Sequence, residues 1–232
     1  MDVEMQNPMA ESQMKLVVEG RRQMVYEGLI ADSVVTAGTL WDTYEICLEE
    51  APAFHLYTST RRVDTPTEPG DGPDVTFVMF EPRLLECSTR QLCVYAGVAE
   101  LRHQLGVQPH TWEYWSEDFL SKGFSKGYWH VGDAERIAVD YDVGDEDVWK
   151  LAARALDYRK ELYLTQIWGA PTRARCDELE EVLKTVTPSA QVLYAPYASN
   201  QTWGDKRDEE AVRRLRRRDA VRAALATHSE SR

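Results

Sequence analysis

The chain has 232 residues, 43% hydrophobic and 28% charged, so it is long enough to bury a core and too apolar to be disordered. Its net charge is −12, and because residues 205–232 hold nine basic and six acidic residues, residues 1–204 carry −15. Such an acidic body binds nucleic acid or anionic membranes poorly in a non-specific manner, and it suits solubility, a basic partner or bound cations.

The N-terminal 13 residues are acidic and lack the apolar segment of a signal peptide, which predicts a flexible leader over 1–13. No apolar run approaches the roughly 20 residues that a membrane span needs. The four cysteines have no metal-ligand spacing, which is typical of reduced thiols in a cytosolic protein. The sequence therefore predicts a cytoplasmic protein without a transmembrane segment or a membrane partner.

Residues 14–80 predict a β-rich N-terminal half. Apolar, β-branched or alternating runs predict its strands, at 15–20, 23–35, 43–50, 53–60 and 74–80. Three prolines and two glycines in 64–74 predict an exposed loop, because neither a helix nor a central strand tolerates that density.

A helix is predicted over 88–105. Ser88 is a suitable first capping residue, apolar residues recur at helical spacing, and Gly106 is a suitable stop. Gly97 in the middle weakens this prediction, because glycine disfavours a helix interior.

Residues 107–134 form an aromatic insert with seven aromatic side chains. Trp112, Trp115 and Trp129 are candidate partner-binding residues, because Trp and Tyr are favoured at interface hot spots. The same side chains could stack on nucleic-acid bases. A third interpretation is a small core that joins the two halves of the chain.

Residues 135–198 alternate between strand and helix patterns, with strands at 136–143, 162–168 and 191–197. Strands separated by single helices predict parallel pairing with right-handed crossovers. The predicted fold class is therefore α/β (or α+β): a β-rich half, a β-α-β-α-β parallel-sheet half and a basic C-terminal helix. Residues 14–204 are expected to form one mixed domain.

The predicted strand at 136–143 ends in acidic residues. Asp140 and Asp142 share one face about 7 Å apart, a spacing that suits Mg²⁺ or Mn²⁺ bound with waters and a substrate phosphate. They also lie at a strand's carboxyl end, where open α/β sheets bind ligands. Alternatively the two residues are simply solvated, and residues 145–147 complement the next helix's N-terminus.

The Asp140-x-Asp142 motif resembles that of haloacid-dehalogenase-type phosphatases, which also place a small hydroxyl residue at the end of the next strand. Thr165 stands roughly there. The chain departs from that pattern at the third strand, which supplies no further acids.

A second group of polar residues follows the later strands. Thr172, Arg173 and Arg175 lie at a predicted helix start, a natural anion site, and Asn200 follows the third strand. Alternatively Thr172 caps the helix and the arginines are surface charges.

The segment 205–232 predicts a basic helix and tail. Its arginine density makes it a candidate docking element for an acidic partner or RNA, through Arg213, Arg214, Arg216, Arg217 and Arg218. The alternative is a solvated terminal helix.

These patterns favour a soluble intracellular binding or assembly protein that uses the aromatic insert and the basic helix as contact surfaces, with a protein partner. One alternative is a divalent-metal-dependent phosphoryl-transfer or hydrolytic enzyme centred on Asp140 and Asp142. Another is an acidic decoy of a nucleic-acid-binding partner. Nucleic acid is an unexpected ligand for the acidic body itself.

Overall fold

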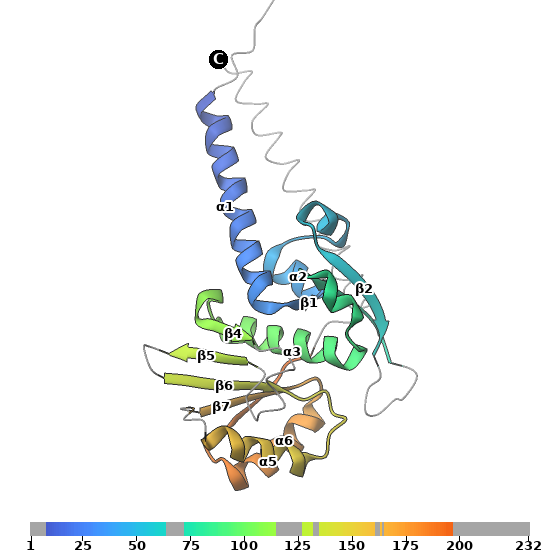
Figure 1. Ribbon diagram of the computed structural model, residues 1–232, viewed down its shortest axis with the longest axis vertical. Helices are drawn as coiled ribbons and strands as arrows, with labels where there is room; N and C mark the ends of the chain where they lie inside the picture. The colour runs from blue at the N-terminus through green and yellow to red at the C-terminus, as the bar shows by residue number, and fades with distance from the viewer. Residues whose placement is uncertain are drawn as a thin grey trace, which may run out of the picture.

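The computed structural model describes residues 8–63, 72–114, 127–131, 135–160, 163 and 165–196. They form a mixed structure of helices and two sheets (Figure 1). The strands are β1 (Val34–Thr36), β2 (Tyr57–Arg62), β3 (Asp74–Met79), β4 (Trp112–Tyr114), β5 (Gly127–Val131), β6 (Glu135–Tyr141), β7 (Thr165–Ala170) and β8 (Gln191–Tyr194). The helices are α1 (Pro8–Asp32), α2 (Ala37–Tyr44), α3 (Thr89–Leu105), α5 (Val148–Lys160) and α6 (Arg173–Val186), with short 3₁₀ helices η1 (Leu48–Phe54), η2 (Pro82–Glu86) and η3 (Pro109–Thr111).

The larger sheet has the order β4-β5-β6-β7-β8. β4, β5 and β6 pair antiparallel, whereas β6 pairs parallel with β7 and β7 parallel with β8. Helices α5 and α6 connect the parallel strands and cover one face of the sheet (Figure 1). The predicted parallel arrangement of the last three strands is confirmed.

Helix α3 covers the opposite face of the larger sheet. Its Val94, Val98 and Leu101 pack with Val139 and Tyr141 of β6 in one buried cluster. The smaller sheet, of order β1-β3-β2, packs against another side of α3, through residues such as Leu92 and Phe77. α3 therefore lies between the two sheets and belongs to both cores (Figure 1).

The predicted bounds of α3 are confirmed by its caps. The Ser88 side chain accepts a hydrogen bond from the N–H of Gln91, and the Gln91 side chain accepts one from the N–H of Ser88. Gly106 ends the helix with φ of 65°, a left-handed conformation that glycine adopts without strain.

Gly97 lies in the middle of α3 because Tyr141 needs the space. A Cβ at Gly97 would overlap the Tyr141 ring, which is fully buried. The Tyr141 hydroxyl donates a hydrogen bond to the carbonyl oxygen of Ala195 over 2.8 Å, which holds the ring in place. Gly97, which disfavours a helix interior, thus permits a close contact between α3 and the Tyr141 ring of β6.

The strands predicted at 15–20 and 23–35 are wrong, apart from the short β1. This part of the chain is α1, and its buried Val25, Leu29 and Asp32 recur at helical spacing. β-branched residues only weakly disfavour a helix, so packing against α3 outweighs local propensity. Helix α1 begins at Pro8, within the predicted leader, and residues 1–7 lie outside the described part, so the flexible leader stays a prediction.

The alternating run 43–50 is not a strand either. It contains the end of α2, a left-handed Glu45 and the start of η1. The strand predicted at 74–80 is confirmed as β3, and β2 overlaps the one predicted at 53–60. The β-rich description of 14–80 is therefore corrected to a mixture of helices and a three-stranded sheet.

Among the described elements, helix α1 is the longest, with 25 residues. Its C-terminal half packs on the body, and its N-terminal half extends away from it (Figure 1). Among the described residues no helix, α1 included, combines the length and apolar character needed to cross a membrane. Most of the predicted loop at 64–74 and the whole basic segment 205–232 lie outside the described residues.

Candidate functional site

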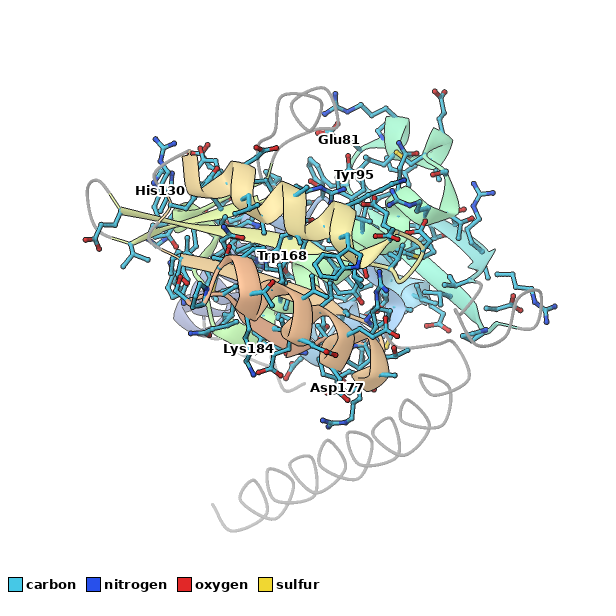
Figure 2. All side chains as sticks on the ribbon, turned by 90° about the horizontal axis from the view of Figure 1, so that it is seen from below. Glu81, Tyr95, His130, Trp168, Asp177 and Lys184 are labelled. Carbon is cyan, nitrogen blue, oxygen red and sulfur yellow. The ribbon has the colours of Figure 1, made fainter. Side chains whose placement is uncertain are left out.

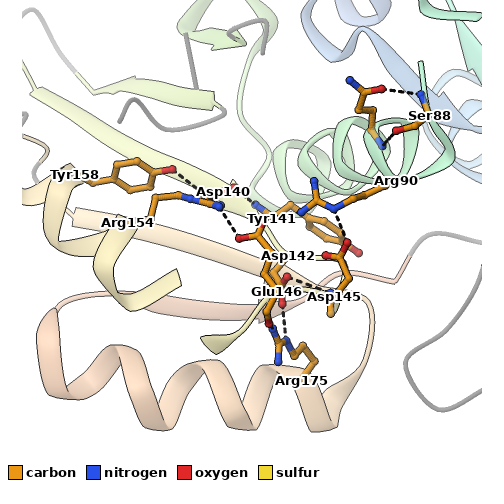
Figure 3. A network of polar contacts seen from close by, with 12 residues as sticks. Ser88, Arg90, Asp140, Tyr141, Asp142, Asp145, Glu146, Arg154, Tyr158 and Arg175 are labelled. Atoms are coloured by element: carbon orange, nitrogen blue, oxygen red, sulfur yellow. Dashed lines mark hydrogen bonds and ion pairs between the residues drawn. The ribbon is translucent and has the colours of Figure 1, made fainter. Parts of the chain in front are cut away.

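Asp140 is buried beneath α5. Alternation along β6 turns Ala138 and Asp140 toward α5 and α6, and Asp140 is only 1% exposed. Its carboxylate accepts hydrogen bonds from the hydroxyl of Tyr158 (2.7 Å) and from Nη1 of Arg154 (3.3 Å), both on α5. It also accepts one from the N–H of Tyr141. The arginine compensates the carboxylate's charge within the fold (Figure 3).

Asp142 is held by α6. It follows the end of β6, and its carboxylate lies 2.5 Å from Nε of Arg175 and 3.1 Å from the N–H of Gly144. The N–H of Asp142 donates to the carbonyl oxygen of Gly169. Asp142 therefore joins the strand end to α6 through a buried ion pair.

The three following acids are also paired. The guanidinium of Arg90, from α3, forms ion pairs with Asp145 and Glu146, with N–O distances of 2.5 Å each. Arg154 forms an ion pair with Glu146 at an N–O distance of 2.6 Å. The Asp147 carboxylate accepts a hydrogen bond from the N–H of Trp149 in the first turn of α5, as expected for a capping residue. Arginines from three helices thus converge on this acidic loop (Figure 3).

The charges of this network set the protonation of its members. Burial lowers the pKa of Arg154, but the nearby Asp140 and Glu146 outweigh it and raise the pKa above its ordinary value. Burial and the charge of Asp140 raise the pKa of Tyr158 well above its ordinary value. Tyr158 is therefore a neutral donor to Asp140 at neutral pH.

A metal ion at Asp140 and Asp142 would have to displace these donors. Both carboxylates are nearly inaccessible and hydrogen-bonded to arginines, whereas a catalytic metal site needs open coordination positions. Within the described ranges no group of three His, Cys, Asp or Glu side chains is placed to hold a metal ion. The Mg²⁺ or Mn²⁺ site remains a prediction. The alternative that the two carboxylates are simply solvated is wrong, because Asp140 and Asp142 are only 1% and 3% exposed and are paired with arginines.

We expect millimolar Mg²⁺ to leave the melting temperature unchanged, because both carboxylates are already neutralised by arginines. Asp140→Asn should lower it by about 5 °C, since the partly buried Arg154 would lose part of its compensation and the buried hydrogen bonds would weaken, at a cost of about 2 kcal/mol. Differential scanning calorimetry with and without metal measures both effects. A metal-dependent rise that Asp140→Asn abolishes would support the metal site instead.

The predicted anion site is used within the fold. The Thr172 side chain caps α6 by accepting a hydrogen bond from the N–H of Arg175. The guanidinium carbon of Arg173 lies 4.7 Å from the centre of the Tyr194 ring. Arg175 forms an ion pair with Asp142, and Asn200 lies outside the described residues. The anion-binding role of these residues stays a prediction.

Thr165 does not occupy the position that the phosphatase resemblance implies. It begins β7 rather than ending it, lies opposite Ile137 in the sheet, and donates to the carbonyl oxygen of Ser189. It is therefore several residues away from the carboxyl edge at which Asp142 lies.

The aromatic insert supplies core residues. Trp112 of β4 lies opposite Trp129 of β5, and it is buried in the cluster that α3 forms with the sheet. Trp129 packs against the same cluster and is partly exposed. The buried position of Trp112 supports the small-core interpretation over a contact role. Trp115 and the five candidate arginines of the C-terminal segment lie outside the described residues.

A buried ionic cluster, which the sequence did not reveal, joins α1, α2 and α3. Asp32 at the end of α1 receives two hydrogen bonds from Arg102, of 2.5 and 2.8 Å, and lies 2.8 Å from Nε2 of His103. Tyr44 at the end of α2 donates to Asp32 over 2.7 Å and accepts from Arg102. We call these four residues the Asp32 cluster.

The cluster holds Asp32 ionised. Burial alone raises the pKa of Asp32, but hydrogen bonds from Arg102 and His103 outweigh it, so the pKa lies below its ordinary value of 3.8. Burial, together with the charge of Asp32, raises the pKa of Tyr44 above its ordinary range, so Tyr44 stays neutral. Asp32 and Arg102 thus form a neutral buried pair.

An open cleft of about 690 Å³ lies beside this cluster. Tyr44, Arg102 and His103 border it, together with part of α1 and the residues that follow α3. Gly28 of α1 is required at the contact, because a Cβ there would overlap the Tyr44 ring.

The sequence concealed this site for two reasons. Asp32 lies about seventy positions from its partners, and no short-range spacing connects residues that meet only when α1 packs on α3. The pattern of residues 23–35 also predicts a strand, whereas Asp32 ends helix α1.

The outer face of α5 exposes apolar side chains. Trp149 is 65% exposed and Leu156 is 40% exposed, and both share a helical face with the exposed Ala153. The opposite face buries Leu151 and Tyr158 in the core. Seen from below, α5 and α6 lie side by side at the surface of the described chain (Figure 2). We call Trp149, Ala153 and Leu156 the α5 stripe.

Comparisons of the chain with protein-family models, with curated proteins and with solved structures found no match. The function is therefore argued from these sites alone.

Proposed function

We propose that this is a binding or assembly protein and that the α5 stripe is its contact surface. The observation that carries the proposal is the 65% exposure of Trp149 on a helix whose opposite face buries Leu151 and Tyr158. Tryptophan is the residue most enriched at interface hot spots, and Leu156 lies two turns along the same face. Contiguous exposed apolar patches, unlike single exposed apolar residues, are associated with interaction sites.

The charges around the stripe define the partner's chemistry. Exposed Asp147 and Asp157 lie at its two ends, and residues 1–204 carry a charge of −15. A partner segment with apolar side chains flanked by Lys or Arg complements both features. The partner is therefore a protein with a basic amphipathic segment.

The acidic strand end supports binding over catalysis. A phosphoryl-transfer enzyme would need Asp140 and Asp142 open to a metal and a substrate, and both are buried in ion pairs with Arg154 and Arg175. Contact roles for Trp115, Trp129 and the C-terminal arginines remain part of the same proposal.

The test compares two variants of exposed apolar residues. Trp149→Gln with Leu156→Gln should reduce specific capture of a protein partner from source-cell extract about tenfold or more, because loss of a hot-spot tryptophan costs about 2 kcal/mol. Ile30→Gln replaces a 59% exposed apolar residue on α1 and should leave capture unchanged. Quantitative mass spectrometry measures capture, and thermal melting checks that both variants fold.

The captured protein must carry a basic amphipathic segment, and a synthetic peptide of that segment must compete for capture. The proposal fails if the double variant captures the same proteins as the wild type. It also fails if the lost partners have no such segment.

A further inference from the structure

We infer that the open edge of β2 binds an extended acidic segment of a partner protein, which joins the three-stranded smaller sheet as a further strand. β2 pairs with β3 on one side and with none of the described strands on the other. Such an edge offers unpaired backbone groups to another extended chain. This inference is independent of the α5 stripe, because β2 and α5 lie on opposite sides of α3 (Figure 1).

The register of β2 identifies the backbone groups that face the open edge. In an antiparallel pair, every second residue exchanges both of its backbone hydrogen bonds with the neighbouring strand. The N–H of Val63 donates to the carbonyl oxygen of Pro73 over 3.0 Å, so Val63 and every second residue before it bond to the β3 side. The backbone groups of Thr58 and Thr60 therefore point toward the open edge.

Thr58 and Thr60 leave two N–H and two C=O groups for an incoming strand. The hydroxyls of Thr60 and Thr76 lie 2.9 Å apart, as expected for the closely spaced side chains of a pair without backbone hydrogen bonds. Both Thr58 and Thr60 are exposed, and their backbone groups have no partner within the described part of the chain. Groups of this kind at strand spacing are recognised by an extended peptide.

Arg61 supplies the charge preference of this edge. Its guanidinium donates to the carbonyl oxygen of Leu85 over 3.3 Å, and its Nε is buried without a hydrogen-bond partner. Among the described residues no carboxylate forms an ion pair with Arg61, and β2 itself contains no acidic residue. A side chain directly opposite Arg61 on an added strand would lie within cross-strand reach, where an opposite charge is favourable. The edge therefore selects Asp or Glu at that position.

Tyr57 selects an apolar residue at the other end of the segment. It lies on the same face of β2 as Arg61, and its side chain is 40% exposed. We expect antiparallel pairing, because both strand pairs of this sheet are antiparallel and parallel pairs are slightly less stable. The partner segment then carries an acidic residue opposite Arg61 and, four positions later, an apolar residue opposite Tyr57.

A synthetic peptide with this pattern, acetyl-TETSTVT-amide, tests the pairing by NMR titration of the isotope-labelled full-length protein. The amide signals of Thr58 and Thr60 should shift, because both N–H groups gain a hydrogen bond. N-methylation of the third and fifth peptide residues, which lie opposite Thr60 and Thr58, should abolish binding. N-methylation of the fourth residue, whose N–H faces away from β2, is the matched control and should preserve it. Equal binding of the two methylated peptides, or no shift of either amide, would overturn the inference.

The charge preference is tested with the lysine peptide acetyl-TKTSTVT-amide. It should bind about fivefold more weakly than the glutamate peptide, as expected for a cross-strand charge pair. Arg61→Gln should remove this difference, whereas Arg22→Gln, the same change at an exposed position of α1, should preserve it. A difference that persists in Arg61→Gln, or the absence of any difference in the wild type, would contradict an acidic partner segment.

Thr58→Pro tests the edge from the side of the protein. Proline is tolerated on edge strands, and this change removes an outward N–H without removing a hydrogen bond to β3. It should weaken binding of acetyl-TETSTVT-amide about fivefold, whereas Thr58→Val, which keeps the N–H, should bind normally. Thermal melting checks that both variants fold. If the amide signals of Thr58 and Thr60 instead change with protein concentration in the absence of peptide, a second copy occupies the edge and the partner assignment is overturned.

Discussion

Gly97→Ala is expected to lower the free energy of unfolding by about 3 kcal/mol, because the new methyl group would overlap the ring of Tyr141. The ring cannot easily move. It is fully buried, its hydroxyl is bonded to the carbonyl oxygen of Ala195, and its other edge lies close to Gly169. Urea denaturation followed by circular dichroism measures the loss.

Gly20→Ala is the matched control, because it is the same substitution in a helix. A Cβ at Gly20 has nothing within 4 Å, so this change should stabilise the protein by about 0.5–1 kcal/mol through helix propensity. Tyr141→Leu should recover part of the loss when combined with Gly97→Ala, because a smaller side chain makes room for the methyl group. A Gly97→Ala protein as stable as the wild type would show that α3 and β6 do not pack as described.

Asp32→Asn is expected to cost about 3–5 kcal/mol, because it leaves the buried charge of Arg102 without its carboxylate partner. Glu180→Gln, which breaks the exposed pair with Lys184, should change stability by less than about 0.5 kcal/mol. Replacing both buried partners, as Asp32→Leu with Arg102→Met, should recover part of the loss, since no charge is then left unpaired. A small effect of Asp32→Asn alone would contradict the buried pair.

The same cluster predicts acid sensitivity. The folded pKa of Asp32 lies below its ordinary value of 3.8, so its contribution to stability is complete above the unfolded pKa. The contribution is lost as the pH falls below 3.8 and through the lower folded pKa. Denaturation at a series of pH values should therefore show a smaller acid-induced loss in Asp32→Leu/Arg102→Met than in the wild type.

The sequence by itself determined the elements whose patterns are local and strong. The capping residues Ser88 and Gly106 predicted both ends of α3. The alternation of single strands with single helices over 135–198 predicted the parallel pairing of β6, β7 and β8, because only a crossover connection of that length joins parallel neighbours. The same pattern correctly placed Asp140 and Asp142 at the end of a strand.

Only the tertiary structure decided that this part of the chain forms the helix α1, because the apolar residues between 15 and 31 suit either a strand or a helix locally. Packing against α3 selects the helix by burying Val25 and Leu29 together. The tertiary structure also decided that Asp140 and Asp142 form ion pairs with Arg154 and Arg175, because these arginines lie on the helices that follow. Asp32 and Arg102 lie seventy positions apart, and their pairing results from the contact between two helices. Local spacing carries no information about such long-range contacts, which is why the cleft could not be predicted from the sequence.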